Sequence, residues 1–149
     1  MKSILAFAAL AVLASAALAV PAVFAQAPAD SAAIRATALD YIEGWYAGDA
    51  DRMARSLNPE LVKRIVMINP DTGEPFIDTM GAGKLVEGSR AAYGRQTPED
   101  QRRTDVTILD IFGNAASVKI DAGGWIDYIH LAKMNDRWSI VNVLWEMRH

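Results

Sequence analysis

The sequence predicts one α+β domain in which three N-terminal helices pack on a mostly antiparallel sheet. Residues 105–146 alternate apolar and polar side chains in segments separated by short turns, which is the pattern of consecutive antiparallel strands. Upstream, residues 31–93 contain three segments whose apolar residues recur at helical spacing. Helices followed by a run of strands are typical of α+β folds, so we expect the helices to cover one face of the sheet.

The composition fits a single globular domain and excludes several kinds of site. The chain has 149 residues, of which 52% are hydrophobic and 22% are charged. It contains no cysteine, which excludes disulfides, thiolate nucleophiles and zinc–thiolate sites. The formal charge of -3 and the lack of a basic block argue against nucleic acid and membrane surfaces as partners.

The first residues predict a secretory signal peptide. Lys2 precedes an apolar run from Ile4 to Val20, and small residues follow. Cleavage fits after Ala25 or after Ala27, and we expect Ala25. The alternative is a retained membrane anchor, for which the run is short and lacks charges after it. The expected organisation, in the periplasm or outside the cell, is a signal peptide at 1–25, a linker at 26–30 and the folded domain at 31–149.

Two helices are expected at the start of the domain. Ser31 can cap the first helix, and Gly48 favours its end. The apolar residues of this helix share one face, and they are Ile34, Ala38, Tyr41, Ile42 and Trp45. Asp49 begins a second, shorter helix with Met53 and Leu57 as its apolar positions.

A strand pair and a third helix are expected next. Asn58-Pro59-Glu60 has the pattern of a helix start, a capping residue followed by proline. Residues 62–68 then read as extended, and residues 69–73 predict a strong turn that returns the chain through Phe76 and Ile77. Thr79 is the candidate cap of the third helix, whose shared face holds Leu85, Val86, Ser89 and Tyr93.

The remaining chain predicts an antiparallel meander. Gly113-Asn114 is a hairpin signal between two alternating segments. The last two strands, at 125–134 and 138–146, are apolar at nearly every second position and partly at the others. We therefore expect both faces of the sheet to be covered, by helices on one side and by a second copy of the chain on the other.

Three segments resemble the nuclear transport factor 2-like superfamily. They are residues 41–53 where the first helix ends, residues 113–119, and residues 127–142. Within the superfamily they are most similar to the secreted bacterial proteins of the putative lumazine-binding family, which lie near SnoaL-like polyketide cyclases. The resemblance covers essentially the whole mature chain. It implies a cone-shaped fold in which a curved sheet wraps its helices around a conical pocket.

The resemblance to ketosteroid isomerase implies two catalytic candidates. Tyr41 falls where that enzyme places an oxyanion-binding tyrosine, and His130 falls near its neutral acidic donor. The position of the base falls at Ile65, so proton transfer of that kind is not expected. If His130 points into the pocket, strand alternation takes Tyr128 with it and turns Asp127 outward. The alternative is that His130 is a packed strand residue with no role in chemistry.

Seven residues are candidates for the ligand pocket: Tyr41, Trp45, Arg64, Tyr128, His130, Asn142 and Trp145. An aromatic wall that stacks on a flat ring can be formed by Tyr41, Trp45, Trp125, Trp138 and Trp145, although aromatic residues at such spacings often belong simply to the core. Lys63 and Arg64 can bind an anionic group or can be solvated. No two histidines or carboxylates share a metal-like spacing, so we expect neither a metal nor a cofactor.

Three functions are compatible with these residues. We favour an exported, non-catalytic protein that binds a small apolar or aromatic molecule in the conical pocket. The second interpretation is an enzyme of the isomerase, dehydratase or cyclase type that uses Tyr41 and His130. The third is a structural module that forms a homodimer through the sheet face.

Overall fold

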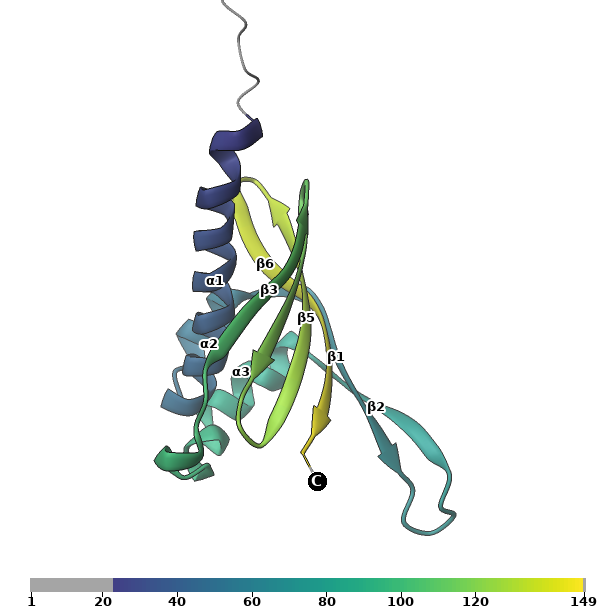
Figure 1. Cartoon of the computed structure of the whole chain (residues 1–149). Helices are drawn as coiled ribbons and strands as arrows, with labels where there is room; N and C mark the ends of the chain where they lie inside the picture. Colours follow the sequence, from purple (N-terminus) through teal and green to yellow (C-terminus); the bar gives the residue numbers. More distant parts are fainter. Residues whose placement is uncertain (1–22, 149) are drawn as a thin grey trace, which may run out of the picture.

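The computed structural model describes residues 23–148, which form three α-helices on one six-stranded sheet (Figure 1). The helices are α1 (Val23–Ala47), α2 (Ala50–Ser56) and α3 (Ala82–Arg90), and α3 is followed by the 3-10 turns η1 (Tyr93–Gln96) and η2 (Glu99–Gln101). The strands are β1 (Leu57–Ile68), β2 (Pro75–Gly81), β3 (Asp105–Phe112), β4 (Ala115–Asp121), β5 (Trp125–Met134) and β6 (Arg137–Met147). The predicted α+β class is confirmed.

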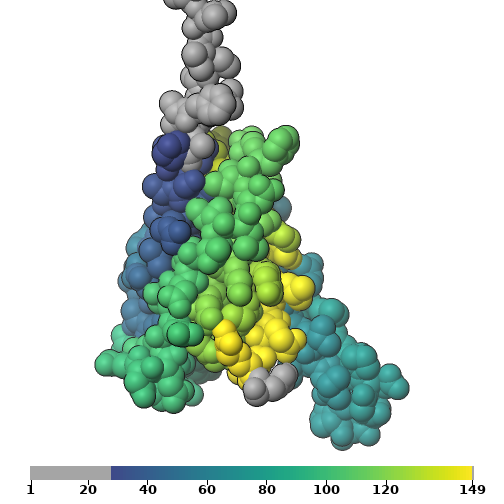
Figure 2. Space-filling model, viewed as in Figure 1, coloured from purple at the N-terminus to yellow at the C-terminus, as the bar shows by residue number. Residues whose placement is uncertain are grey.

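The strands lie in the order β2-β1-β6-β5-β4-β3. All neighbouring pairs are antiparallel except β1 and β6, which run parallel. The helices lie on one side of the curved sheet, and the distal part of the β1–β2 hairpin projects away from the body (Figures 1 and 2). This arrangement gives the sheet an inner face toward the helices and an outer face without a helix.

The hydrophobic core lies between α1 and the inner face of the sheet. Ile34, Ala38 and Ile42 recur at helical spacing on α1 and are fully buried. They pack against the side chains that point to the inner face of the sheet, which are every second residue of each strand. Among the buried ones are Val118, Ile120, Ile129, Leu131, Ile140 and Val143. Burial of these side chains orients α1 along the sheet. The C-terminal turns of α1 then face β1 and β5.

The end of α1 and the start of α2 agree with the prediction. Gly48 has a φ of 65°, a conformation that costs glycine little, and it reverses the chain there. The side chain of Asp49 caps α2 by accepting a hydrogen bond from the backbone N–H of Arg52 at 2.9 Å.

Three predicted boundaries are wrong. The first helix begins at Val23 and passes Ser31, so the predicted linker residues 26–30 are helical here. Residues 58–60 belong to β1, where Asn58 accepts a hydrogen bond from the Glu60 N–H beside an irregularity in the pairing with β6. Thr79 pairs with Arg64 in the β1–β2 ladder, and α3 starts after Gly81. At Thr79, sheet pairing overrides a local capping signal.

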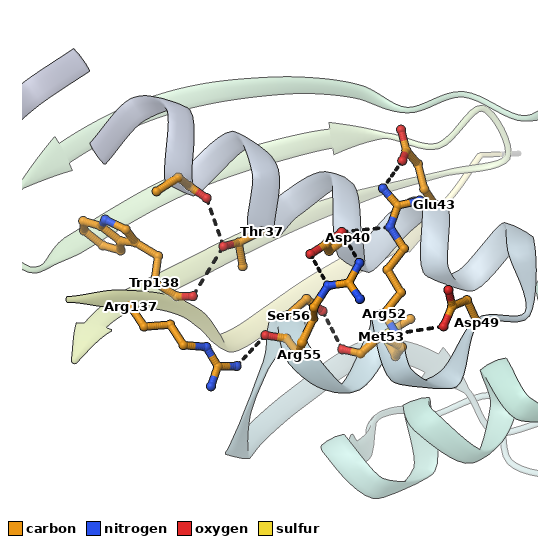
Figure 3. A network of polar contacts seen from close by, with 11 residues as sticks. Thr37, Asp40, Glu43, Asp49, Arg52, Met53, Arg55, Ser56, Arg137 and Trp138 are labelled. Carbon is orange, nitrogen blue, oxygen red and sulfur yellow. Dashed lines mark hydrogen bonds and ion pairs between the residues drawn. The ribbon is translucent and has the colours of Figure 1, made fainter. Parts of the chain in front are cut away.

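A network of polar contacts joins α1, α2 and the start of β6 (Figure 3). Asp40 binds Arg52 at 2.8 Å and Arg55 at 2.7 Å, and Arg52 also pairs with Glu43. The Arg137 side chain donates to the Arg55 carbonyl. The network fixes the direction of α1 opposite the sheet, and hence the position of the α1 side chains that point inward.

The predicted signal peptide and its cleavage after Ala25 remain predictions, since most of that segment lies outside the described residues. Within residues 23–148, no helix combines the length and the apolar character that a membrane crossing requires.

Candidate functional site

A cavity of about 410 Å³ lies between α1, α3, the η1–η2 segment and the inner face of the sheet. Its volume is within the range of small-molecule sites in proteins. Most of its wall is apolar or aromatic, with a few polar side chains, and the lining residues are Tyr41, Ile42, Trp45, Lys63, Met80, Leu85, Tyr93, Gln96, Thr97, Pro98, Gln101, Trp125, Trp145 and Met147.

Secondary structure explains how these side chains converge. Tyr41 and Trp45 are four residues apart on α1 and therefore lie one turn apart on the same face. From the sheet, Lys63 on β1 pairs with Met80 on β2, and Trp125 on β5 pairs with Met147 on β6. The loop of η1 and η2 closes the remaining side.

A polar cluster occupies the wall where α1 faces β1 and β5. The Lys63 Nζ donates to Asp127 Oδ1 at 2.6 Å and to the Tyr41 hydroxyl at 2.7 Å. The Trp125 indole N–H donates to Asp127 Oδ2 at 2.8 Å. Lys63 Nζ also lies 4.6 Å from the centre of the Trp145 ring, within the range of a cation–π interaction. Residues far apart in the sequence therefore form one connected group.

The cluster is buried, and its burial controls its protonation. Burial lowers the pKa of Lys63, against the opposing effect of the Asp127 charge. Burial also raises the pKa of Tyr41 well above 10.0, and the negative charge of Asp127 acts in the same direction. Tyr41 is therefore a neutral phenol, a hydrogen-bond donor as well as an acceptor, throughout the physiological range.

The cluster leaves one hydrogen-bonding position open. An ammonium group has three N–H donors, and the described residues supply two polar acceptors to Lys63. Both oxygens of Asp127 already accept bonds. A ligand acceptor placed in the cavity can take the third N–H of Lys63, while the surrounding indole rings contact its apolar body.

Three of the seven predicted pocket residues, Tyr41, Trp45 and Trp145, line the cavity. The other four lie on the outer face of the sheet. There Arg64 donates to Asn142 at 2.6 Å, and Asn142 lies 3.2 Å from His130 Nδ1. Tyr128 is 46% exposed.

The predicted orientation of β5 is wrong, because Asp127, Ile129 and Leu131 are its buried residues. Burying Ile129 and Leu131 together favours this orientation, and period two then turns Tyr128 and His130 outward. His130 therefore cannot act with Tyr41 on one molecule.

The seven predicted pocket residues leave out Lys63, Asp127 and Trp125. The sequence presents Lys63 only as an anion-binding or solvated residue, Trp125 only as part of an aromatic wall, and Asp127 as an outward residue. A signal for Lys63 and Asp127 was present. Lys63 alternates with the buried residues Leu61 and Ile65, and Asp127 alternates with Ile129 and Leu131. A single charged residue on the apolar face of each of two strands predicts a buried pair.

Within the described part of the chain, no group of three or more His, Asp or Glu side chains is arranged to hold a metal ion.

The model of the family described as putative lumazine-binding matches residues 29–146 of this chain. No curated protein matches the chain at a significant level.

Solved structures share the fold at low sequence identity. A nuclear transport factor 2-like protein of unknown function from Shewanella baltica is 19% identical, with a TM-score of 0.61 over 82% of this chain and 96% of that one. A nuclear transport factor 2-like protein with a cystatin-like fold from Novosphingobium aromaticivorans is 13% identical, with a TM-score of 0.60 over 90% and 92%. Hexachlorocyclohexane dehydrochlorinase LinA-type3 from Novosphingobium barchaimii is 12% identical, with a TM-score of 0.58 over 85% and 91%. These similarities establish the fold and do not establish a shared activity.

Proposed function

Because the chain belongs to the putative lumazine-binding family of the nuclear transport factor 2-like superfamily, we propose that it is an exported, non-catalytic protein that binds a small, flat, largely apolar molecule. The observation that carries this proposal is the cavity of about 410 Å³, which has aromatic walls and one buried polar cluster. A few polar groups in an otherwise apolar cavity are typical of sites that orient a small molecule.

The lining of the cavity suggests the chemical class of the ligand. Trp45, Trp125 and Trp145 offer large aromatic surfaces for a planar ring system. The available N–H of Lys63 and the Tyr41 phenol favour a ligand with a carbonyl or another oxygen acceptor at one edge. A fused heterocycle with ring carbonyls meets both requirements, and the family description makes lumazine the first such molecule to test.

Binding is tested by isothermal titration calorimetry with lumazine on the protein without residues 1–25. We expect saturable binding to the wild-type protein and at least about tenfold weaker binding to Leu85→Trp, which adds bulk to the cavity wall. Leu144→Trp is the matched control, because Leu144 is 48% exposed on the outer face of the sheet. Native mass spectrometry of protein purified from the periplasm tests for other ligands.

An empty protein in native mass spectra, together with no lumazine binding, contradicts the binding proposal. Equal binding to wild type and Leu85→Trp contradicts the assignment of the site to this cavity.

A second proposal, that the chain forms a homodimer through the outer face of the sheet, has separate support. Apolar side chains from four strands of this face are about half exposed: Val66 at 46%, Ile77 at 54%, Tyr128 at 46% and Leu144 at 48%. Val66 pairs with Ile77, and Tyr128 pairs with Leu144, so they form two cross-strand pairs. Exposed apolar surface of this kind favours an interface.

A further inference from the structure

Lys63 places a primary amine at the wall of an apolar cavity. It lines the cavity, yet its side chain is only 7% exposed. The lysines at positions 84, 119 and 133 do not line this cavity. Lysine side chains usually extend their amine into water, and Lys63 instead keeps it among Tyr41, Asp127 and Trp145.

The neighbours of this amine are those that nucleophilic addition to a carbonyl requires. An amine attacks only after it loses its proton, and a desolvated lysine in an apolar pocket loses it more readily than a solvated one. Asp127 Oδ1 lies 2.6 Å from Lys63 Nζ and can receive this proton. The Tyr41 hydroxyl lies 2.7 Å from Nζ and can donate to an oxygen bound to the carbon under attack.

We propose that Lys63 captures aldehydes and ketones covalently, as a reversible imine formed inside the cavity. The proposal rests on the proposed binding function, since the carbonyl compound occupies the same cavity. The aromatic walls select carbonyl compounds with a flat apolar body over small polar sugars or keto acids.

The reaction balances with the groups present. The Lys63 ammonium gives a proton to Asp127, and the nitrogen lone pair forms a bond to the carbonyl carbon. The carbonyl oxygen takes up a proton from Tyr41, which regains one from the nitrogen. The carbinolamine hydroxyl then leaves as water, with the proton held by Asp127, while the nitrogen lone pair completes the C=N bond. The last of the three N–H protons remains on the iminium or passes to the Asp127 carboxylate, which the loss of water has left deprotonated, and no oxidant or reductant takes part.

The competing interpretation is that Lys63 and Asp127 form only a structural ion pair. Buried ion pairs are weak contributors to stability and can often be replaced by apolar residues. A structural pair keeps its amine protonated and makes no covalent adduct. Adduct formation at Lys63 therefore separates the two interpretations.

The test uses 2-naphthaldehyde with sodium cyanoborohydride, which reduces an imine to a stable secondary amine. We expect one naphthylmethyl group per chain in intact mass spectra, located by tryptic mapping to Lys63. Labelling of Lys63 should be at least about tenfold faster than labelling of exposed Lys84, because the cavity holds the aldehyde beside a desolvated amine whose proton acceptor, Asp127, lies 2.6 Å away. Lys63→Met should lose the fast adduct, and Lys84→Met should keep it.

Tryptic mapping of the labelled wild-type protein tests the proposal even if Lys63→Met fails to fold. Labelling of Lys63 no faster than of Lys84 overturns it. Binding of 2-naphthalenemethanol, which has no carbonyl, distinguishes failure of the covalent proposal from failure of the binding function. If the alcohol binds and the aldehyde leaves Lys63 unlabelled, the covalent proposal falls while the binding function stands. If neither compound binds and Lys63 is unlabelled, the covalent proposal falls, and the lumazine titration with the native mass spectra decides the binding function.

Discussion

Lys63 on β1 and Asp127 on β5 are buried charged side chains on the inner face of the sheet, beside the cavity. A buried charge is stable only when it is paired and hydrogen-bonded. Here the carboxylate has two donors and the ammonium has two acceptors. The two residues therefore depend on each other. Replacing both should destabilise the protein by less than the sum of the two single replacements.

The first prediction is a strong coupling between these residues. Asp127→Leu should lower the free energy of unfolding by about 3–5 kcal/mol, because it leaves the Lys63 ammonium buried without its carboxylate. Lys63→Met should have a comparable cost for the same reason. The double variant should be more stable than the sum of the single effects implies. Urea denaturation of the four proteins measures this, and simple additivity would contradict the pairing.

The second prediction concerns alkaline pH and Tyr41. Its pKa in the folded protein is raised well above the usual 10.0. Above pH 10 the unfolded chain loses a phenol proton that the folded protein keeps, so this residue's contribution to stability falls as pH rises. Tyr41→Phe removes the proton. We expect the stability of wild type relative to Tyr41→Phe to decrease between pH 9 and pH 11, as followed by urea denaturation.

A constant difference between the two proteins over this range would mean that Tyr41 titrates normally.

At the residue scale, the sequence predicts the aromatic part of the site better than its polar part. Tyr41 and Trp45 follow from a helical face, which local spacing defines. The polar cluster depends on which face of β5 is buried. A shift of the strand by one residue would move every β5 side chain to the opposite face of the sheet. Choosing His130 as the inward residue therefore removed Asp127 from consideration. Only the packing of Ile129 and Leu131 against the helices decides between the two.

At the scale of elements, the η1 turn closes the cavity because Gly94 lets it approach α1. A Cβ atom added at Gly94 would lie 2.2 Å from the carbonyl oxygen of Trp45 and 2.7 Å from the Trp45 ring. No ordinary adjustment of a side chain relieves a clash with the backbone. The close approach therefore requires glycine, and it brings Tyr93 and Gln96 to the cavity wall.

The third prediction compares two glycine substitutions. Gly94→Ala should destabilise the protein by about 1–3 kcal/mol and weaken ligand binding, because η1 must move away from Trp45. Gly83→Ala should stabilise it by about 0.5–1 kcal/mol, because Gly83 lies in α3 and nothing within 4 Å obstructs a new Cβ. Thermal denaturation and calorimetry measure both effects. Equal stability of the two variants would contradict the steric role of Gly94.

The sequence predicts the helices, hairpins and meander because their signals are local. Gly48 with Asp49 and Gly113 with Asn114 mark turns that the structure contains. The parallel pairing of β1 with β6 has no local signal, since it joins residues far apart in the chain. Residues 58–60, expected as a helix start, lie in the irregular part of β1 between Leu57 and Val62, which both pair with β6. Non-local pairing also sets the position of Lys63 opposite α1.

At the scale of the whole molecule, the two faces of the sheet have different roles. The inner face carries the core and the cavity. The outer face carries a polar row of Arg64, Asn142 and His130 beside the exposed Tyr128 and Leu144. Mixed polar and apolar surfaces of this kind are typical of interfaces between folded subunits. Dimer formation on this face would leave the cavity side free for ligand.

The last prediction tests this separation of roles. The protein without residues 1–25 should be a dimer at micromolar concentration in size-exclusion chromatography with light scattering. Tyr128→Asp with Leu144→Asp should make it a monomer, because two carboxylates per subunit would be buried without partners at the interface. Phe112→Asp is the control, since Phe112 is 85% exposed at the β3–β4 turn. The monomeric variant should still bind lumazine, because its cavity is unchanged. A monomeric wild type would contradict the dimer, whereas loss of binding in a folded monomer would show that the two faces act together.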